Sequence, residues 1–364
     1  MFNLQADLVP YVLTLAGLLI ALAASGLIRL FDCRAWPKGT VWFFGLFFGV
    51  MVPVLGWWEV TREQPLILSG GDAEARFAIH VFLLAVMVLI ARIDFEHYTI
   101  PDAVMIPATI IAVALMTRFP GAAMPDYDVD PCTGIIFPRV MTALPSLTRD
   151  SSRMAACFGA ILFWVFALLD RRWYPRLGLR KCLALFCRRI RQSYLTWLLL
   201  ILAVLALSLV WRIYGTPPGT YEANKVALLS ALTGMTASMV LIWGVRLIGG
   251  WVLGREAMGF GDVVLMGFLG AVFGWQGGLV LFFLAPLAGV LFGLARLVSR
   301  SPREIPYGPF LCLAALGVIF GWEKILPQIH DFLIGPLVAA ILLAMGVLMA
   351  LLLWVIQLLK RMVR

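Results

Sequence analysis

The sequence predicts an all-α protein, a polytopic integral membrane helix bundle with about eleven transmembrane helices. Of its 364 residues, 62% are hydrophobic and only 13% are charged, which excludes an ordinary soluble domain. The mean hydropathy of +0.96 agrees with this class. Lysine and arginine also gather in alternate loops, as expected for a protein that crosses the membrane many times.

Apolar runs near the length of a membrane span recur along the chain. They cover roughly 9–28, 41–58, 77–93, 102–117, 154–170, 194–212, 227–247, 262–274, 278–297, 307–322 and 333–359. The eighth and ninth runs form one apolar tract interrupted at Gly274-Trp275-Gln276-Gly277-Gly278, where glycine is expected to break the helix. The eighth run is short for a span, so the count is approximate.

The basic residues predict how the bundle is oriented. If the N-terminus lies outside and the C-terminus inside, the cytoplasmic loops hold 20 of the 29 lysines and arginines. Eight of these 20 lie in the segment 171–191. The net charge of +9 is therefore mostly an excess on the cytoplasmic face, which favours contact with anionic lipids and not with nucleic acid.

Cysteine and histidine do not indicate a cofactor or a metal. The six cysteines are scattered without a Cys-x-x-Cys pair, and the three histidines are too dispersed to form a ligand cluster. Isolated thiols are the expected state of the nearest pair, Cys182 and Cys187. We therefore expect no metal and no cofactor.

Two carboxylates lie at the ends of apolar runs. Asp94 follows the run 77–93, and Asp262 opens the run 262–274. A charge at the bilayer centre costs roughly 2.5–3.5 kcal/mol on insertion scales, so acids near spans indicate functional sites. Two carboxyls within hydrogen-bond reach share a proton, which lets one activate water while the other protonates a leaving amine. The predicted topology places both acids at the cytoplasmic boundary and so favours a catalytic pair.

Each acid also has a structural interpretation. Glycines such as Gly259 and Gly261 often let membrane helices pack, and Asp262 is a good helix cap. The sequence Ile-Pro-Asp at 100–102 is typical of a helix start, where the helix dipole favours Asp102. Asp94 is not needed as a cap, and its presence on the same face favours catalysis. Glycine near Asp262 would also let a substrate backbone approach closely.

At these residues the chain resembles the type IV prepilin peptidase family, membrane aspartic proteases of the Gly-x-Gly-Asp class. The family pattern of Asp, five residues and then Ile-Pro-Asp stands at 94–102, and Gly-x-Gly-Asp stands at 259–262. A third pattern, Ile-Pro-Tyr-Gly-Pro-Phe, stands at 305–310. The resemblance covers roughly 77–117 and 227–322.

The resemblance implies one membrane-embedded peptidase domain, 1–364, in the inner membrane of a bacterium, with Asp94 and Asp262 as the catalytic pair. It implies that prepilins or pseudopilins of a type IV pilus or type II secretion system are cut at a short basic leader. Eight further residues are expected to bind substrate or support the site: Gly259, Gly261, Glu96, Asp102, Glu256, Pro306, Gly308 and Pro309. Among them, Glu96 and Glu256 would supply an acidic patch that attracts the basic leader.

The chain departs from the family in two ways. It lacks the cysteine-rich domain that many bacterial members carry near the N-terminus, so N-methylation of the product is not expected. A probable insertion, 118–226, separates the two acids and comprises an irregular outside loop, two spans and the basic segment 171–191. Two added spans keep both acids on one side. The basic segment is expected to contact anionic lipid; the alternative is that it docks a secretion partner.

Two other functions remain open. A multispanning transporter also holds membrane carboxylates, although these are expected near the middle of spans and within repeated halves. A non-catalytic scaffold of a pilus or secretion machine would keep the fold without needing both acids. The oligomeric state does not follow from the sequence.

Overall fold

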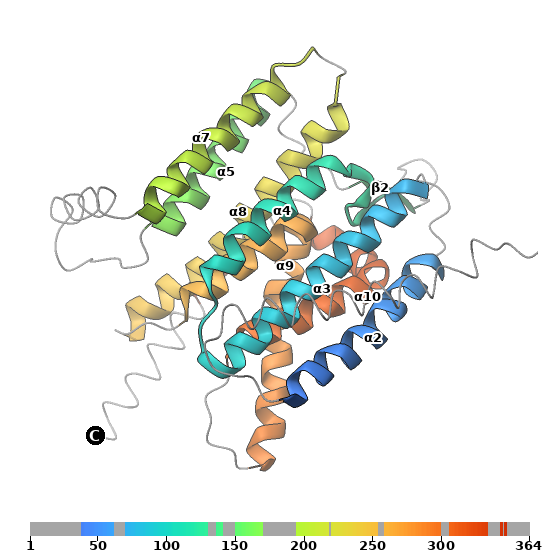
Figure 1. The fold of residues 1–364 in the computed structure, drawn as a ribbon, viewed down its shortest axis with the longest axis vertical. Helices are drawn as coiled ribbons and strands as arrows, with labels where there is room; N and C mark the ends of the chain where they lie inside the picture. The colour runs from blue at the N-terminus through green and yellow to red at the C-terminus, as the bar shows by residue number, and fades with distance from the viewer. Residues whose placement is uncertain are drawn as a thin grey trace, which may run out of the picture.

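The computed structural model describes residues 38–61, 70–129, 136–140, 150–169, 194–217, 220–253, 258–299, 306–333, 343–344 and 346–347. The helices are α2 (Lys38–Thr61), α3 (Gly70–His97), α4 (Asp102–Arg118), α5 (Asp150–Leu169), α7 (Tyr194–Tyr214), α8 (Glu222–Leu253), α9 (Phe260–Ser299) and α10 (Gly308–Leu333). A short 3₁₀ helix, η1 (Pro120–Ala122), and two strands, β1 (Pro125–Val129) and β2 (Ile136–Val140), complete the described elements (Figure 1).

The predicted class, a polytopic membrane helix bundle, is confirmed. Five described helices are long and apolar enough to cross a membrane, and two more apolar helices are shorter. Every predicted span between 41 and 322 coincides with a helical segment. The span 9–28 and most of 333–359 lie outside the described residues, so the count of eleven stays a prediction.

Helix α9 is broken at the predicted position. Gly274 has φ 70° and ψ −179°, a conformation that only glycine adopts readily. A Cβ atom at Gly270 or at Gly278 would collide with the same atom, Ser238 Oγ on α8. Eight residues of straight helix span about 12 Å, so both positions can meet Ser238 only if the chain turns back at Gly274. The two halves of α9 thus correspond to the predicted runs 262–274 and 278–297.

The loop that follows α4 is more ordered than predicted. Instead of a wholly irregular excursion, β1 and β2 pair as antiparallel strands, with Pro125 opposite Val140 and Val129 opposite Ile136. Prolines at 125 and 138 suggested an irregular chain, but proline is tolerated in a two-stranded ribbon because every strand has a free edge. The hairpin is the one described exception to the all-α prediction.

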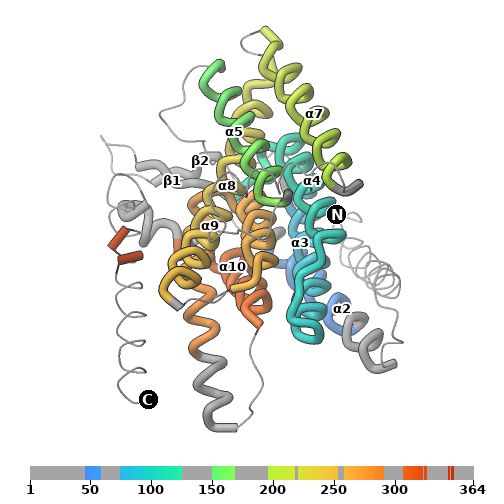
Figure 2. The backbone as a smooth tube through the Cα atoms, turned by 90° about the vertical axis from the view of Figure 1, so that its left-hand side faces the viewer, coloured from blue at the N-terminus to red at the C-terminus, as the bar shows by residue number. Residues whose placement is uncertain are grey.

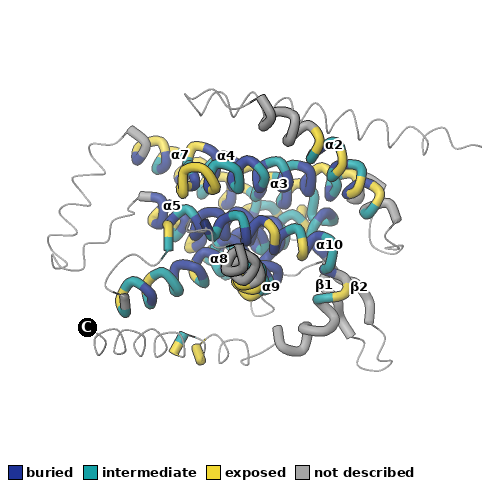
Figure 3. Tube along the Cα trace, turned by 90° about the horizontal axis from the view of Figure 1, so that it is seen from below, coloured by how far each residue is buried: buried dark blue, intermediate teal, exposed yellow. Residues whose placement is uncertain are grey.

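The core forms where α9 packs against α8, α4 and α10. Small residues let α8 and α9 approach closely, since a Cβ at Gly267 would collide with Met239 and one at Gly234 with the backbone of Gly270. Buried residues gather on these helices, while α2 and α7 carry many exposed apolar side chains (Figure 3). Exposed apolar faces at the periphery are typical of lipid contact.

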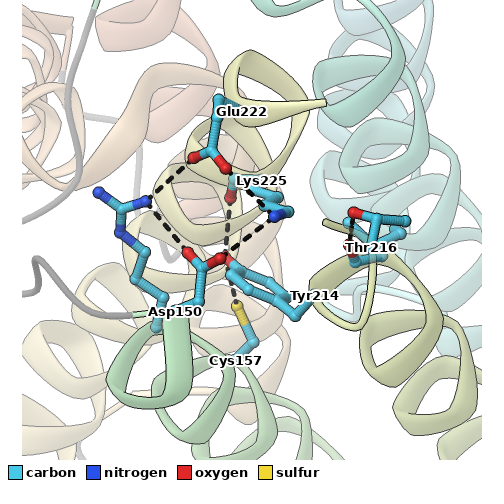
Figure 4. A network of polar contacts seen from close by, with 8 residues as sticks. Asp150, Cys157, Tyr214, Thr216, Glu222 and Lys225 are labelled. Atoms are coloured by element: carbon cyan, nitrogen blue, oxygen red, sulfur yellow. Dashed lines mark hydrogen bonds and ion pairs between the residues drawn. The ribbon is translucent and has the colours of Figure 1, made fainter. Parts of the chain in front are cut away.

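Helices α5 and α7, both within the predicted insertion, pack side by side at one edge of the bundle (Figure 2). Buried Lys225 on α8 forms ion pairs with Asp150 on α5 (3.2 Å) and with Glu222 (3.1 Å). The Tyr214 hydroxyl at the end of α7 donates to the Lys225 carbonyl oxygen (2.8 Å), and the Cys157 thiol lies 3.7 Å from that hydroxyl (Figure 4). This polar network fixes both helices to α8 at one end of the bundle.

Candidate active site

Asp94 lies in the last turn of α3 and is only 5% exposed. The helix ends because Tyr98 adopts a left-handed conformation (φ 54°) while its N–H still donates to the Asp94 carbonyl oxygen (2.9 Å). Pro101 then precedes the first residue of α4 and is compatible with a helix start. The short turn buries Ile100, which lies against Gly261 of the next motif.

Asp262 lies in the first turn of α9 and is 8% exposed. The two glycines before it differ in their surroundings. A Cβ at Gly261 would lie 2.7 Å from Ile100 Cβ, so glycine is needed for the α3–α4 turn to reach α9. A Cβ at Gly259 would meet only Asp262 Oδ2, at an ordinary 3.6 Å, and Gly259 is exposed. Gly261 therefore serves helix packing, whereas Gly259 is open to a ligand.

The third motif joins the same site at the start of α10. The Gly308 N–H donates to the Asp94 carboxylate. A Cβ at Gly308 would lie 2.6 Å from Asp94 Oδ2, so only glycine permits this approach. Within the described residues, Oδ2 of Asp94 has no hydrogen-bond partner although it is buried. Three segments distant in sequence thus converge on one carboxyl group.

The structure brings Asp94 and Asp262 close enough to interact electrostatically. Two further side chains lie beside them. Cys312 on α10 interacts with both carboxyls, and its thiol donates to the Met87 carbonyl oxygen (3.5 Å). Burial raises the pKa of Tyr307, and neighbouring Asp262 raises this pKa further, so the phenol stays neutral.

Sequence reasoning named neither Tyr307 nor Cys312 as a site residue. Tyr307 stood within the third motif, and Cys312 lies four residues after Gly308, hence on the same helix face. Arg246 was also missed; its Nε donates to the Met258 carbonyl oxygen (3.0 Å) and its guanidinium lies 5.4 Å from the Phe260 ring. This contact ties the end of α8 to the segment that leads into Asp262, a long-range contact that no local pattern indicates.

The remaining predicted site residues lie around the pair or outside the described chain. Glu96 is exposed and forms an ion pair with Arg92, one turn earlier on α3. Asp102 is partly buried in the first turn of α4, and Pro306 and Pro309 flank the start of α10. Glu256 lies outside the described residues. Among the residues that the structure describes, no group of three or more His, Cys, Asp or Glu could hold a metal ion.

Part of this chain, including Asp262, is similar to a known protein family. Residues 185–294 match the model of the type IV leader peptidase family. The predicted resemblance to the type IV prepilin peptidase family is thereby confirmed. The match includes the Gly-x-Gly-Asp motif of the prepilin peptidases, starts within the predicted insertion and leaves out Asp94.

Curated relatives carry the name prepilin leader peptidase/N-methyltransferase. One from Aeromonas salmonicida (strain A449) is 32% identical over 111 residues, 30% of this chain and 35% of the relative. One from Pseudomonas aeruginosa is 32% identical over 127 residues, 34% of this chain and 40% of the relative. One from Xanthomonas campestris pv. campestris is 34% identical over 122 residues, 32% of this chain and 41% of the relative. The chain thus spans less than half the length of these prepilin peptidases, and no solved structure matches it.

Proposed function

We propose that this protein is a membrane aspartic endopeptidase that removes the short basic leader of prepilin or pseudopilin precursors at the cytoplasmic membrane face. Asp94 and Asp262 are its catalytic pair. The observation that carries this proposal is the meeting of two buried carboxyls from distant motifs, with the Gly308 N–H directed at one of them. Both acids lie at helix ends, where a substrate chain can arrive from the aqueous side.

The geometry supports general acid–base hydrolysis. A pair of neighbouring carboxyls retains one proton between them because two charges so close repel each other. The ionised member takes a proton from a water molecule, which attacks the scissile carbonyl carbon. The protonated member donates a hydrogen bond to the carbonyl oxygen and later a proton to the leaving amine. Asp94 Oδ2 has no hydrogen-bond partner among the described residues, so the Asp94 carboxyl retains a free acceptor for the reaction.

Other residues around the two carboxyls are suited to supporting the reaction. The Gly308 N–H holds the Asp94 carboxylate in one orientation, and the neutral Tyr307 phenol is a donor beside Asp262. Exposed Gly259 leaves room for a substrate backbone next to Asp262. Exposed Glu96, two residues after Asp94, would attract a basic leader by exchanging its partner Arg92 for a basic residue of the leader. We expect peptidase activity without N-methylation, although the relatives' names include both activities.

Co-expression with prepilins from the same genome tests this function. Leader removal is scored on a gel, and mass spectrometry of the product N-terminus reports the cut site and any methyl group. We expect Asp94→Asn and Asp262→Asn each to abolish cleavage while the protein accumulates normally in the membrane, since both changes are near-isosteric. Asp102→Asn is the matched control and should have a mild effect, because Asp102 only favours the start of α4.

The alternatives give different results in this assay. A transporter or a scaffold would leave every prepilin uncut in the wild type as well as in the variants. Substantial cleavage by either single variant would instead show that hydrolysis occurs but that this pair does not perform it.

A further inference from the structure

A cavity of about 620 Å³ lies between α4, α5, α7 and α8, away from the carboxyl pair. Helices α5 and α7 form one side of it, with Trp164 and Ala206, and α4 and α8 form the other, with Ala114 and Leu232. None of the residues assigned to the candidate active site lines it. The cavity therefore needs an explanation that the proposed peptidase reaction does not supply.

The cavity has the length of one membrane leaflet. It extends along α4 from Thr109 to Arg118 and along α7 from Leu202 to Arg212. Ten or eleven residues of helix rise about 15 Å. This is half of the roughly 30 Å hydrocarbon core of a bilayer. Because α4 begins beside the carboxyl pair and ends at Arg118, the cavity occupies the leaflet far from that pair.

The lining of the cavity suits the acyl chain of a lipid. Apolar side chains form nearly all of it, and the basic residues lie only at the end of α4 and α7. A lipid has the same arrangement, since its apolar chain ends near the middle of the bilayer and its charged headgroup lies at the surface.

The charge at the end of the cavity far from the carboxyl pair indicates which lipid headgroup would lie there. Arg118 and Arg212 both line this end, both are exposed, and neither forms an ion pair with an acid of the described residues. The nearby acids of the polar network, Asp150 and Glu222, are already paired with Arg153 and Lys225. Two guanidinium groups above an apolar cavity favour an anionic phosphate headgroup.

We propose that this cavity binds one acyl chain of an anionic phospholipid, with Arg118 and Arg212 at its phosphate. The lipid fills the space that α5 and α7 leave against α4 and α8. Exchange of an acyl chain between bilayer and cavity changes little apolar exposure, so the headgroup charge decides which lipid is held. The proposal is independent of the proposed peptidase function.

A photoactivatable phosphatidylglycerol with a diazirine on one acyl chain tests this site. The purified, delipidated full chain is mixed with this probe in detergent, irradiated and digested, and the labelled peptides are identified by mass spectrometry. We expect labelling of peptides from α7 and α8 around Ala206 and Leu232, and at least fivefold less labelling with the matching phosphatidylcholine probe. No labelling there in the wild type would mean that protein fills the cavity, and would overturn the proposal.

Matched variants make the test specific. Ala206→Trp and Ala114→Trp fill the cavity from facing helices and should each lower labelling at least fivefold. Val204→Trp is the control, since Val204 is 65% exposed on α7 and does not line the cavity. Arg118→Gln with Arg212→Gln should remove the preference for phosphatidylglycerol, whereas Lys324→Gln, an exposed cation on α10, should not. Equal labelling of all cavity and control variants would also overturn the proposal.

Discussion

At the residue scale, Gly259 and Gly261 differ although both belong to the Gly-x-Gly-Asp motif. Alanine at 261 would place its Cβ 2.7 Å from Ile100 Cβ, and neither backbone can yield without moving Asp94 or Asp262. Alanine at 259 meets nothing closer than 3.6 Å. The sequence predicted both glycines as site residues but not their separate roles, because the contact with Ile100 joins segments far apart in the chain.

We therefore expect Gly261→Ala to lower the cleavage rate at least tenfold and to lower the thermal unfolding temperature as well. Small shifts of reacting groups cost about 100-fold in rate, which makes this a conservative figure. Gly259→Ala is the control for stability alone, because Gly259 is proposed to face the substrate, and its unfolding temperature should equal that of the wild type. If both variants unfold at the same temperature, the packing role of Gly261 is wrong.

Tyr307 gives a second prediction at this scale. Burial and neighbouring Asp262 raise the pKa of Tyr307, so the phenol keeps its proton throughout the range in which an ordinary tyrosine begins to ionise. Tyr307→Phe should reduce kcat by about tenfold through loss of a donor beside a carboxyl group. The shape of the pH–rate profile should not change, since the raised pKa excludes tyrosine ionisation from its basic side. A basic limb that moves in Tyr307→Phe would contradict this assignment.

At the element scale, the spans and the break in α9 could be predicted from composition alone, because apolar length and glycine clusters are local signals. The β1–β2 hairpin and the polar network around Lys225 could not, since both depend on pairing between distant segments. The same distinction holds at the site. Asp94 and Asp262 could be predicted as site residues because each is a charge beside an apolar run. Cys312 could not, because its place in the site depends on the packing of α10 against α3.

The break in α9 predicts that replacing Gly274 lowers the stability of the protein. Gly274→Ala forces a side chain into a conformation that costs of order 1–3 kcal/mol. We expect this variant to unfold at a lower temperature in detergent and to lose activity as the two halves of α9 shift. Gly244→Ala on α8 is the control, because no atom lies within 4 Å of its new Cβ and alanine favours a helix. A Gly274→Ala protein as stable as Gly244→Ala would mean that the turn does not require glycine.

At the scale of the whole molecule, the described helices place the β hairpin and the carboxyl pair at opposite ends of the bundle (Figure 1). The orientation of these ends in the membrane rests on the charge pattern. A cysteine replacing Asp128 on β1, in a background without other cysteines, should react with an impermeant thiol reagent from outside. A single cysteine at 182 should react only after the membrane is made permeable. The reverse labelling would place the carboxyl pair at the outer face and exclude cytoplasmic leader cleavage.

The contact between Cys312 and Met87 joins residues 225 positions apart, and the Gly308 N–H reaches Asp94 over a similar stretch of chain. During synthesis, α3 leaves the ribosome long before α10, so Asp94 enters the membrane before the Gly308 N–H has been made. Under the proposed function, we expect no cleavage until α10 has been synthesised and has packed against α3. The order of synthesis therefore delays the assembly of the site until α10 has packed against α3.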